Sequence, residues 1–168
     1  MKKFLVKWSR KALASGLFIG YFPVMPGTAA SALVAGLVWF GAVRHPGVMA
    51  ATPALYQWTA LVLLAAAGMF VCNGAAELFG REDPPRIVFD ELVGQLFTFF
   101  MVPLGWKTVL LGFLLFRFFD IVKPYPVYKM EEIEDGAGIM MDDVAAGIWA
   151  NIVLHLTLYG YHAVKAYL

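Results

Sequence analysis

The sequence predicts an all-helical membrane protein, a bundle of about five membrane segments preceded by an amphipathic helix. Its 168 residues are 61% hydrophobic, with a mean hydropathy of +0.71, whereas a soluble domain is about 45–50% apolar. The stretches 12–43 and 45–76 carry no charge with His neutral, and a spanning helix needs about 20 apolar residues. The length suits one domain, residues 1–168.

Residues 1–15 are predicted to form a helix that lies on the membrane surface. One face at helical spacing carries Phe4, Leu5, Trp8 and Ala12, and five Lys/Arg of the first eleven residues lie largely opposite. This pattern suits an anionic membrane surface. A basic flank that only orients the chain in the membrane is an equally simple interpretation.

Two uncharged membrane segments follow. Residues 20–27 contain two prolines and two glycines and break the first apolar stretch. A segment is then predicted over 29–43, with Thr28 in position to cap its N-terminus. An Arg-His-Pro-Gly turn at 44–47 ends it, and a second segment is predicted over 55–75.

Three further segments carry charges at their ends. The segment 87–104 begins at Asp90 and Glu91, and the segment 107–122 has Arg117 and Asp120 in its last turns, just before Lys123. A polar loop with two glycines leads to the last segment, 142–166, which is predicted to open at Asp142 and Asp143.

Basic residues set the expected orientation. With the N-terminus in the cytoplasm, five spans place the connectors 76–87 and 123–141 on the same side, and the cytoplasmic parts, Arg81 included, hold nine Lys/Arg against three outside. The charged segment ends and Thr28 all fall on that side. We therefore expect residues that are distant in sequence to converge at the cytoplasmic face.

Charges at the edge of the hydrocarbon are costly and indicate function. Carboxylates suit a divalent cation such as Mg²⁺, and Arg and Lys bind phosphate. The structural alternatives are helix capping by Asp142 and Asp143, and a salt-bridge ladder of Arg117, Asp120 and Lys123. The mixture favours phosphoryl chemistry on a lipid headgroup. The alternative function is an ion-coupled transporter using the same carboxylates, although a transport site is expected near mid-bilayer.

The sequence does not support nucleic-acid binding or a cysteine-based structural site. The net charge of +1 gives no reason to expect nucleic-acid binding. The single cysteine, Cys72, excludes a disulfide framework and a CxxC metal site.

Four separated motifs carry a family resemblance: PGTAAS at 26–31, FDELVG at 89–94, FRFFDIVKPYP at 116–126 and GAGIMMDDVAAG at 136–147. With them the chain resembles the phosphatidylglycerophosphatase A family of bacteria over residues 16–160, with Ala30 where the family has glycine. The resemblance implies Mg²⁺-dependent hydrolysis of phosphatidylglycerophosphate to phosphatidylglycerol and inorganic phosphate. It also implies a multi-pass protein of the bacterial inner membrane, acting at the cytoplasmic face in phospholipid biosynthesis.

The resemblance and the charge pattern point to one set of site residues. We expect the metal ligands to be Asp90, Glu91, Asp142 and Asp143. The catalytic residues are expected to be Asp120, Glu91 and Arg117, with Asp120 orienting Arg117 or activating water. Arg117 and Lys123 would bind the phosphate, and the first motif adds Thr28 and Ser31 as substrate contacts. Anionic membrane lipids are the expected partners, and no sequence signal bears on the oligomeric state.

Overall fold

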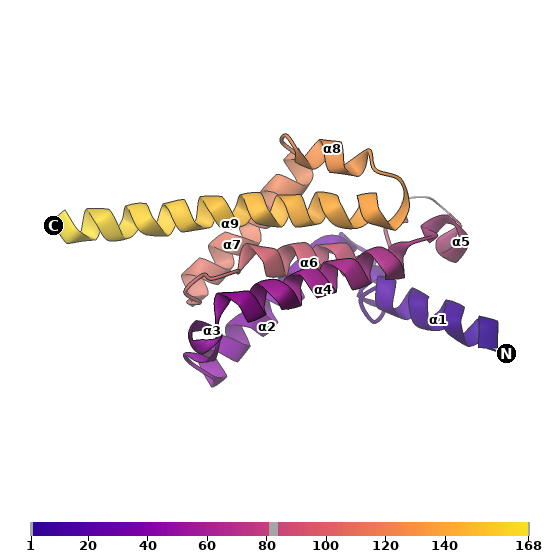
Figure 1. The fold of residues 1–168 in the computed structure, drawn as a ribbon, viewed down its shortest axis with the longest axis horizontal. Coiled ribbons are helices and arrows are strands. Elements are labelled where there is room, and N and C mark those ends of the chain that lie inside the picture. Colours follow the sequence, from indigo (N-terminus) through magenta and orange to yellow (C-terminus); the bar gives the residue numbers. More distant parts are fainter. Residues whose placement is uncertain (1, 81–83, 168) are drawn as a thin grey trace.

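A computed structural model describes residues 2–80 and 84–167, and the regular elements in these ranges are all helical (Figure 1). In chain order they are α1 (Lys2–Ala14), the 3-10 turn η1 (Ile19–Tyr21), α2 (Pro26–Arg44), α3 (Val48–Ala51), α4 (Ala54–Cys72), α5 (Ala75–Phe79), α6 (Phe89–Thr98), α7 (Trp106–Val122), α8 (Val127–Glu131) and α9 (Asp135–Tyr167).

Among the described residues, three helices, α2, α4 and α9, are long and apolar enough to cross a membrane. The all-helical membrane class is therefore confirmed, whereas the expected count of about five is not. Helix α7 has 17 residues, and α6 has 10 instead of the predicted 87–104. At 1.5 Å per residue α6 is about 15 Å long, half of a 30 Å hydrocarbon core.

Helix α9 differs most from its prediction, because its 33 residues begin at Asp135 and not at Asp142. The glycines that signalled a loop are close-packing positions inside the helix. A Cβ at Gly136 would lie only 2.8 Å from Asn73 Cα, at the end of α4. The carboxylate of Asp135 accepts a hydrogen bond of 2.6 Å from the Gly74 N–H, which ties the two helix ends together.

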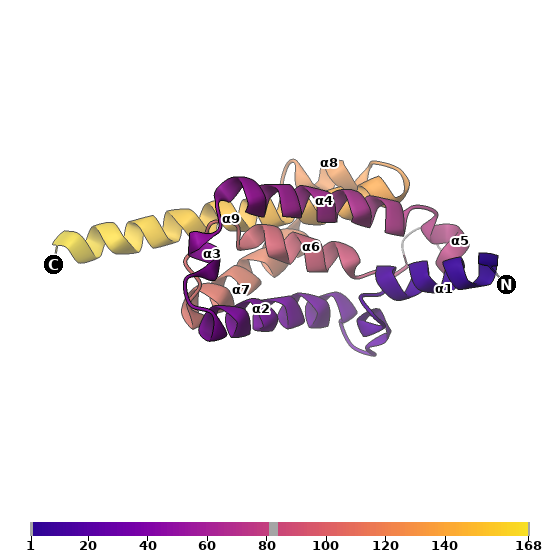
Figure 2. The same cartoon turned by 60° about the horizontal axis from the view of Figure 1, so that its bottom comes forward.

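Helix α6 lies at the centre of the bundle, between α2, α4, α7 and α9 (Figure 2). Val93 and Phe97 of α6 pack against α4 and α9 in one buried cluster. Figures 1 and 2 also show α9 running the length of the bundle and beyond it towards the C-terminus. The short central helix thus has its first turn surrounded by longer helices.

Helix α1 forms where the N-terminal helix was predicted. The side chains of Lys2, Lys3 and Phe4, and the whole of Arg81, lie outside the described residues. Leu5 and Trp8 are exposed, as are the residues between them. Arg10, however, points into the protein, donating to the carbonyls of Phe70, Val71 and Asn73 at the end of α4. Contact of α1 with a membrane surface stays a prediction.

Candidate metal and phosphate site

A cavity of about 950 Å³ opens at one end of the bundle, where α2, α6 and α9 begin and α7 ends. Charged side chains dominate its lining. Among the described residues, nine carboxylates and two cations face it: Asp90, Glu91, Asp120, Glu131, Glu132, Glu134, Asp135, Asp142 and Asp143, with Arg117 and Lys123. The predicted convergence of distant charged residues on one end of the bundle is therefore confirmed.

Three carboxylates form the innermost group. Asp90 and Glu91 lie in the first turn of α6, Asp143 comes from α9, and one oxygen from each lies within 4.8 Å of the others. Asp90 Oδ1 and Glu91 Oε2 are buried and have no hydrogen-bond partner within the described ranges 2–80 and 84–167. Buried carboxylate oxygens without partners are costly, so this group suits a cation.

Glycines bring the helices close enough to form this group. A Cβ at Gly94 would stand 2.6 Å from the Asp143 carbonyl oxygen, and one at Gly147 would stand 3.0 Å from Phe97 Cβ. The backbones of α6 and α9 therefore touch directly, as small residues allow in membrane bundles. This contact places Asp143 beside Asp90 and Glu91.

A third glycine lets α2 meet Glu91. A Cβ at Gly27 would stand 2.8 Å from Glu91 Cδ, and nearer still to its Oε1. Helix α2 opens with Met25 as N-cap in the left-handed conformation and Pro26 in its first turn, so the predicted cap at Thr28 was wrong. Pro suits this position because it has no N–H to leave unpaired.

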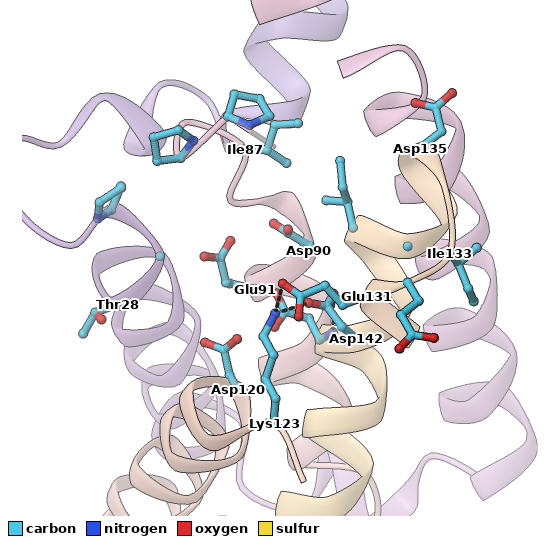
Figure 3. Close-up of a pocket in the computed structure, with 18 of the residues that line it drawn as sticks. Thr28, Ile87, Asp90, Glu91, Asp120, Lys123, Glu131, Ile133, Asp135 and Asp142 are labelled. Atoms are coloured by element: carbon cyan, nitrogen blue, oxygen red, sulfur yellow. Dashed lines mark hydrogen bonds and ion pairs between the residues drawn. The ribbon is translucent and has the colours of Figure 1, made fainter. Parts of the chain in front are cut away.

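Asp142 lies beside this group and forms an ion pair with a lysine side chain. Lys123 Nζ lies 2.8 Å from Asp142 Oδ2 and 2.9 Å from Glu131 Oε1, as the dashed lines in Figure 3 show. Asp142 Oδ1 accepts the Asp143 N–H at 2.9 Å. Both aspartates lie within α9, past its first turn, so the alternative that they cap the helix was wrong.

Lys123 ends α7 as its C-cap, in the left-handed conformation. Its ion pairs in the described part of the chain are with Asp142 and Glu131 and not with Asp120, so the predicted ladder does not extend to it. Burial alone would lower the pKa of Lys123, but its bonds to the two carboxylates outweigh burial and raise the pKa above the usual value. Its ammonium group is therefore charged at the cavity wall.

Arg117 pairs with Asp120 at 2.7 Å, as their spacing predicted. Each side chain is only 16% exposed, and Arg117 Nε is buried without a hydrogen-bond partner from any residue that the structure describes. The guanidinium is thus oriented by one carboxylate and keeps a donor unused. Such a group is suited to pairing with a phosphate.

The two residues of the first motif have different surroundings. Thr28 lines the cavity, and no described residue forms a hydrogen bond with its buried hydroxyl. Ser31 is fully buried, does not line the cavity, and donates to the Gly27 carbonyl at 2.9 Å. The structure therefore brings Thr28, but not Ser31, to the predicted substrate side.

The protonation of the α6 pair fits a cation site. Burial raises the pKa of Asp90 to about 6. Burial, and then the negative charge of Asp90, raise the pKa of Glu91 well above its usual value. A cation would relieve both effects by favouring the charged forms. The donor set consists of hard oxygens, which Mg²⁺ prefers over soft or nitrogen ligands.

Together, three membrane-capable helices and an acidic cavity that also presents Arg and Lys define a class. The protein is a helical membrane protein with a cavity in which clustered carboxylates lie beside an arginine and a lysine. Residues 12–158 match the model of the family described as phosphatidylglycerophosphatase A, and the chain belongs to this family. It is therefore a lipid phosphatase.

Three curated proteins are similar in sequence to this chain. A Haemophilus influenzae protein named phosphatidylglycerophosphatase A is 43% identical over 61% of this chain and 63% of its own. The Escherichia coli protein of the same name is 32% identical over 89% and 83%. A Bacteroides thetaiotaomicron protein named "Putative phosphatidylinositol-3-phosphatase" is 39% identical over 84% and 89%. No solved structure matches the chain.

Sequence reasoning missed two residues of the site, Glu131 and Gly27. Glu131 is one of four acids in a polar loop, and spacing alone does not distinguish it from its neighbours. Gly27 stands within the PGTAAS motif, which was a signal for it, but its contact with Glu91 depends on how α2 packs against α6.

Proposed function

We propose that this protein hydrolyses phosphatidylglycerophosphate to phosphatidylglycerol and inorganic phosphate, with Mg²⁺ as cofactor. The observation that carries the proposal is the arrangement of three close carboxylates beside Arg117 and Lys123 in one cavity, in a chain of this family. Carboxylates with bound Mg²⁺, together with Arg and Lys, are the usual means of stabilising a phosphoryl group during transfer.

Asp90, Glu91 and Asp143 would hold the cation. When bound, Mg²⁺ supplies a Lewis acid that polarises the phosphoryl group and offsets its negative charge. Asp142 was expected to be a fourth ligand. Its contact with Lys123, 2.8 Å from its Oδ2, instead supports a role in holding that ammonium group at the edge of the three carboxylates.

The remaining residues bind and orient the phosphomonoester. Arg117 donates from its guanidinium to two phosphate oxygens while Asp120 keeps it in place, 2.7 Å away. Lys123 adds a point charge. As water attacks phosphorus and the P–O bond to the glycerol breaks, the buried Glu91 Oε2 accepts the proton of the attacking water. The departing glycerol oxygen takes up a proton from water to become a hydroxyl, and Glu91 returns its proton to water after turnover.

We place the reaction at the cytoplasmic face of the inner membrane, in the synthesis of membrane phospholipid. The five Lys/Arg among the first eleven residues, with no acid, support a cytoplasmic N-terminus and hence this orientation. The cavity lies at the start of α2, α6 and α9, and not halfway along the spanning helices. This position supports hydrolysis at a headgroup over ion-coupled transport.

Phosphatidylinositol 3-phosphate is a second candidate substrate, favoured by the name of the 39% identical relative. It carries the same reacting group, a phosphate monoester on a lipid headgroup. The two lipids differ in the size of the alcohol that must fit between the walls of the cavity.

Phosphate release by the purified protein in detergent tests both candidates. The protein would be given each lipid with Mg²⁺ and then with EDTA, and Asp143→Asn would be the matched control for contaminating phosphatase. Release from phosphatidylglycerophosphate that EDTA and the variant both abolish is the expected result. Faster release from phosphatidylinositol 3-phosphate would reverse the assignment. Release from neither lipid by folded protein would favour the transporter hypothesis, to be measured as ion flux.

A further inference from the structure

The loop between α1 and α2 exposes a run of apolar side chains. We call residues 17–25 the apolar loop. Ile19 is half-buried, whereas six of its large hydrophobic residues are between 45% and 73% exposed: Leu17, Phe18, Tyr21, Phe22, Val24 and Met25. These residues lie outside the spanning helices α2 and α4, where exposed apolar side chains need no explanation. A contiguous apolar surface of this kind marks a binding or membrane contact.

The backbone of the apolar loop is firmly held. Leu17 donates its N–H to the Ala12 carbonyl at 2.7 Å, and Gly20 donates to the Ser15 carbonyl at 3.0 Å. A Cβ at Gly20 would stand 3.2 Å from Arg86 Cα, so the loop packs directly on the segment that precedes α6. Leu17 and Phe18 adopt left-handed backbone angles, φ 54° and 74°, which side chains disfavour. The fold thus keeps a strained conformation that turns apolar groups outward.

The apolar loop continues into the wall of the cavity. Its last residue, Met25, lines the cavity together with Pro26, Pro84, Pro85 and Ile87. Another part of the lining is mainly acidic: Glu131, Glu132, Glu134 and Asp135, together with Ile133. Figure 3 shows Thr28 at the left of the cavity and Ile133 and Asp135 at the right, with Glu91 and Glu131 between them. We call the lining by Met25, Pro26, Pro84, Pro85 and Ile87 the apolar wall, and the mainly acidic lining at 131–135 the acidic wall.

A basic side chain lies beside the apolar loop. The Arg86 guanidinium lies 5.0 Å from the ring centre of Tyr21 in the apolar loop, and Arg86 is exposed. Helix α1, which precedes the loop, also carries Lys7 and Lys11, and Lys11 Nζ lies 5.5 Å from the ring centre of Phe79 in α5. Apolar side chains beside Lys and Arg match the boundary between acyl chains and anionic headgroups. The acidic wall has the opposite preference and would face water.

We propose that the apolar loop docks the acyl chains of an anionic phospholipid and admits the lipid sideways from the bilayer into the cavity. The phosphate would then reach Arg117 and Lys123 while the chains stay against Phe22, Val24 and Met25. The carboxylates of the acidic wall repel anionic headgroups, so the membrane surface does not approach the cavity from that side. That the docked lipid is the substrate rests on the proposed function; the docking of the loop in the bilayer does not.

A comparison of two substrates separates docking from chemistry. The double variant Phe22→Ser/Val24→Ser would be assayed on long-chain phosphatidylglycerophosphate in mixed micelles, and on a water-soluble short-chain form of the same lipid. We expect the KM for the long-chain lipid to rise about tenfold, because two apolar side chains no longer hold the acyl chains. The KM for the short-chain form and both kcat values should stay within about twofold. Val48→Ser/Leu55→Ser is the matched control, since these residues are 58% and 70% exposed and do not line the cavity.

Equal effects on the two substrates, or none on either, would overturn the proposal, as would the same effect in the control variant. A second measurement does not depend on turnover. The single native cysteine, Cys72, is buried, so a nitroxide can be attached selectively to Val24→Cys in vesicles of phosphatidylglycerol. We expect the label to be relaxed by oxygen and protected from a water-soluble nickel chelate. Relaxation by nickel would overturn docking even if the enzyme activity is confirmed.

Discussion

Gly27→Ala should disable the cation site while leaving the protein folded. The added methyl group would stand 2.8 Å from Glu91 Cδ and nearer still to Oε1, whereas carbon atoms in contact are about 3.5–4.0 Å apart. The Glu91 carboxylate must therefore move by about 1 Å or turn to another rotamer. Only the end of a flexible side chain is in the way, so α2 itself need not shift.

The functional cost of that movement is large. Cation ligands must lie within about 0.2 Å of their proper distance, and displaced groups around a metal typically cost about 10–100-fold in affinity or activity. We expect the Mg²⁺ concentration for half-maximal activity to rise by about that factor. The folding cost is small, because Ala is favoured over Gly inside a helix by up to about 1 kcal/mol. The melting temperature should therefore stay level or rise.

The assay is phosphate release as a function of Mg²⁺ concentration, with thermal unfolding followed by circular dichroism. Gly36→Ala is the matched control, since it makes the same change in the same helix where no described atom lies within 4 Å of the new Cβ. Adding Glu91→Asp to Gly27→Ala should partly lower the Mg²⁺ concentration for half-maximal activity towards the wild-type value, because the shorter side chain avoids the methyl group.

Two results would refute this reasoning. One is a folded Gly27→Ala protein with the wild-type Mg²⁺ requirement. The other is an absence of turnover that no Mg²⁺ concentration restores and that Glu91→Asp leaves unchanged, since the methyl group would then be blocking something other than Glu91.

Three further predictions concern individual side chains. Asp143→Asn should reduce phosphate release below about 1% of wild type, with an unchanged circular dichroism spectrum; a rate near wild type would remove Asp143 from the cation site. Lys123→Met should raise KM about tenfold and change kcat less, as measured by steady-state kinetics; a pure kcat effect would contradict a binding role. Burial raises the pKa of Asp90 to about 6, so protons compete with Mg²⁺ below that pH, and the Mg²⁺ requirement should rise as the pH falls from about 7 to about 5. A Mg²⁺ requirement that is constant over this range would show that Asp90 is not a ligand.

The sequence was most informative where chemistry and periodicity agreed. The uncharged stretches predicted α2 and α4 to within about three residues at each end, because a bilayer demands long apolar helices. The i, i+3 spacing of Arg117 and Asp120 predicted their ion pair, because it depends only on local helix geometry.

The sequence failed where a local signal had a tertiary cause. Gly136 and Gly138 were interpreted as parts of a loop, yet they allow α9 to begin early against α4 and the preceding turn. Their lack of a side chain serves packing and not chain reversal. The structural alternative paired Lys123 with Asp120 by spacing, but Lys123, in its left-handed cap conformation, pairs with Asp142 and Glu131. Neither outcome can be deduced from neighbours along the chain.

The division of the site between α6 and α9 has a consequence for biosynthesis. Asp90 and Glu91 are made early, but Asp143, which completes the group, belongs to the last helix. While the ribosome is still synthesising the chain, the inserted part holds two crowded carboxylates and no third ligand. If the three carboxylates bind the cation as proposed, this site assembles only when α9 packs beside α6. On that assignment, a prematurely terminated product that lacks α9 is expected to be inactive, whatever its stability.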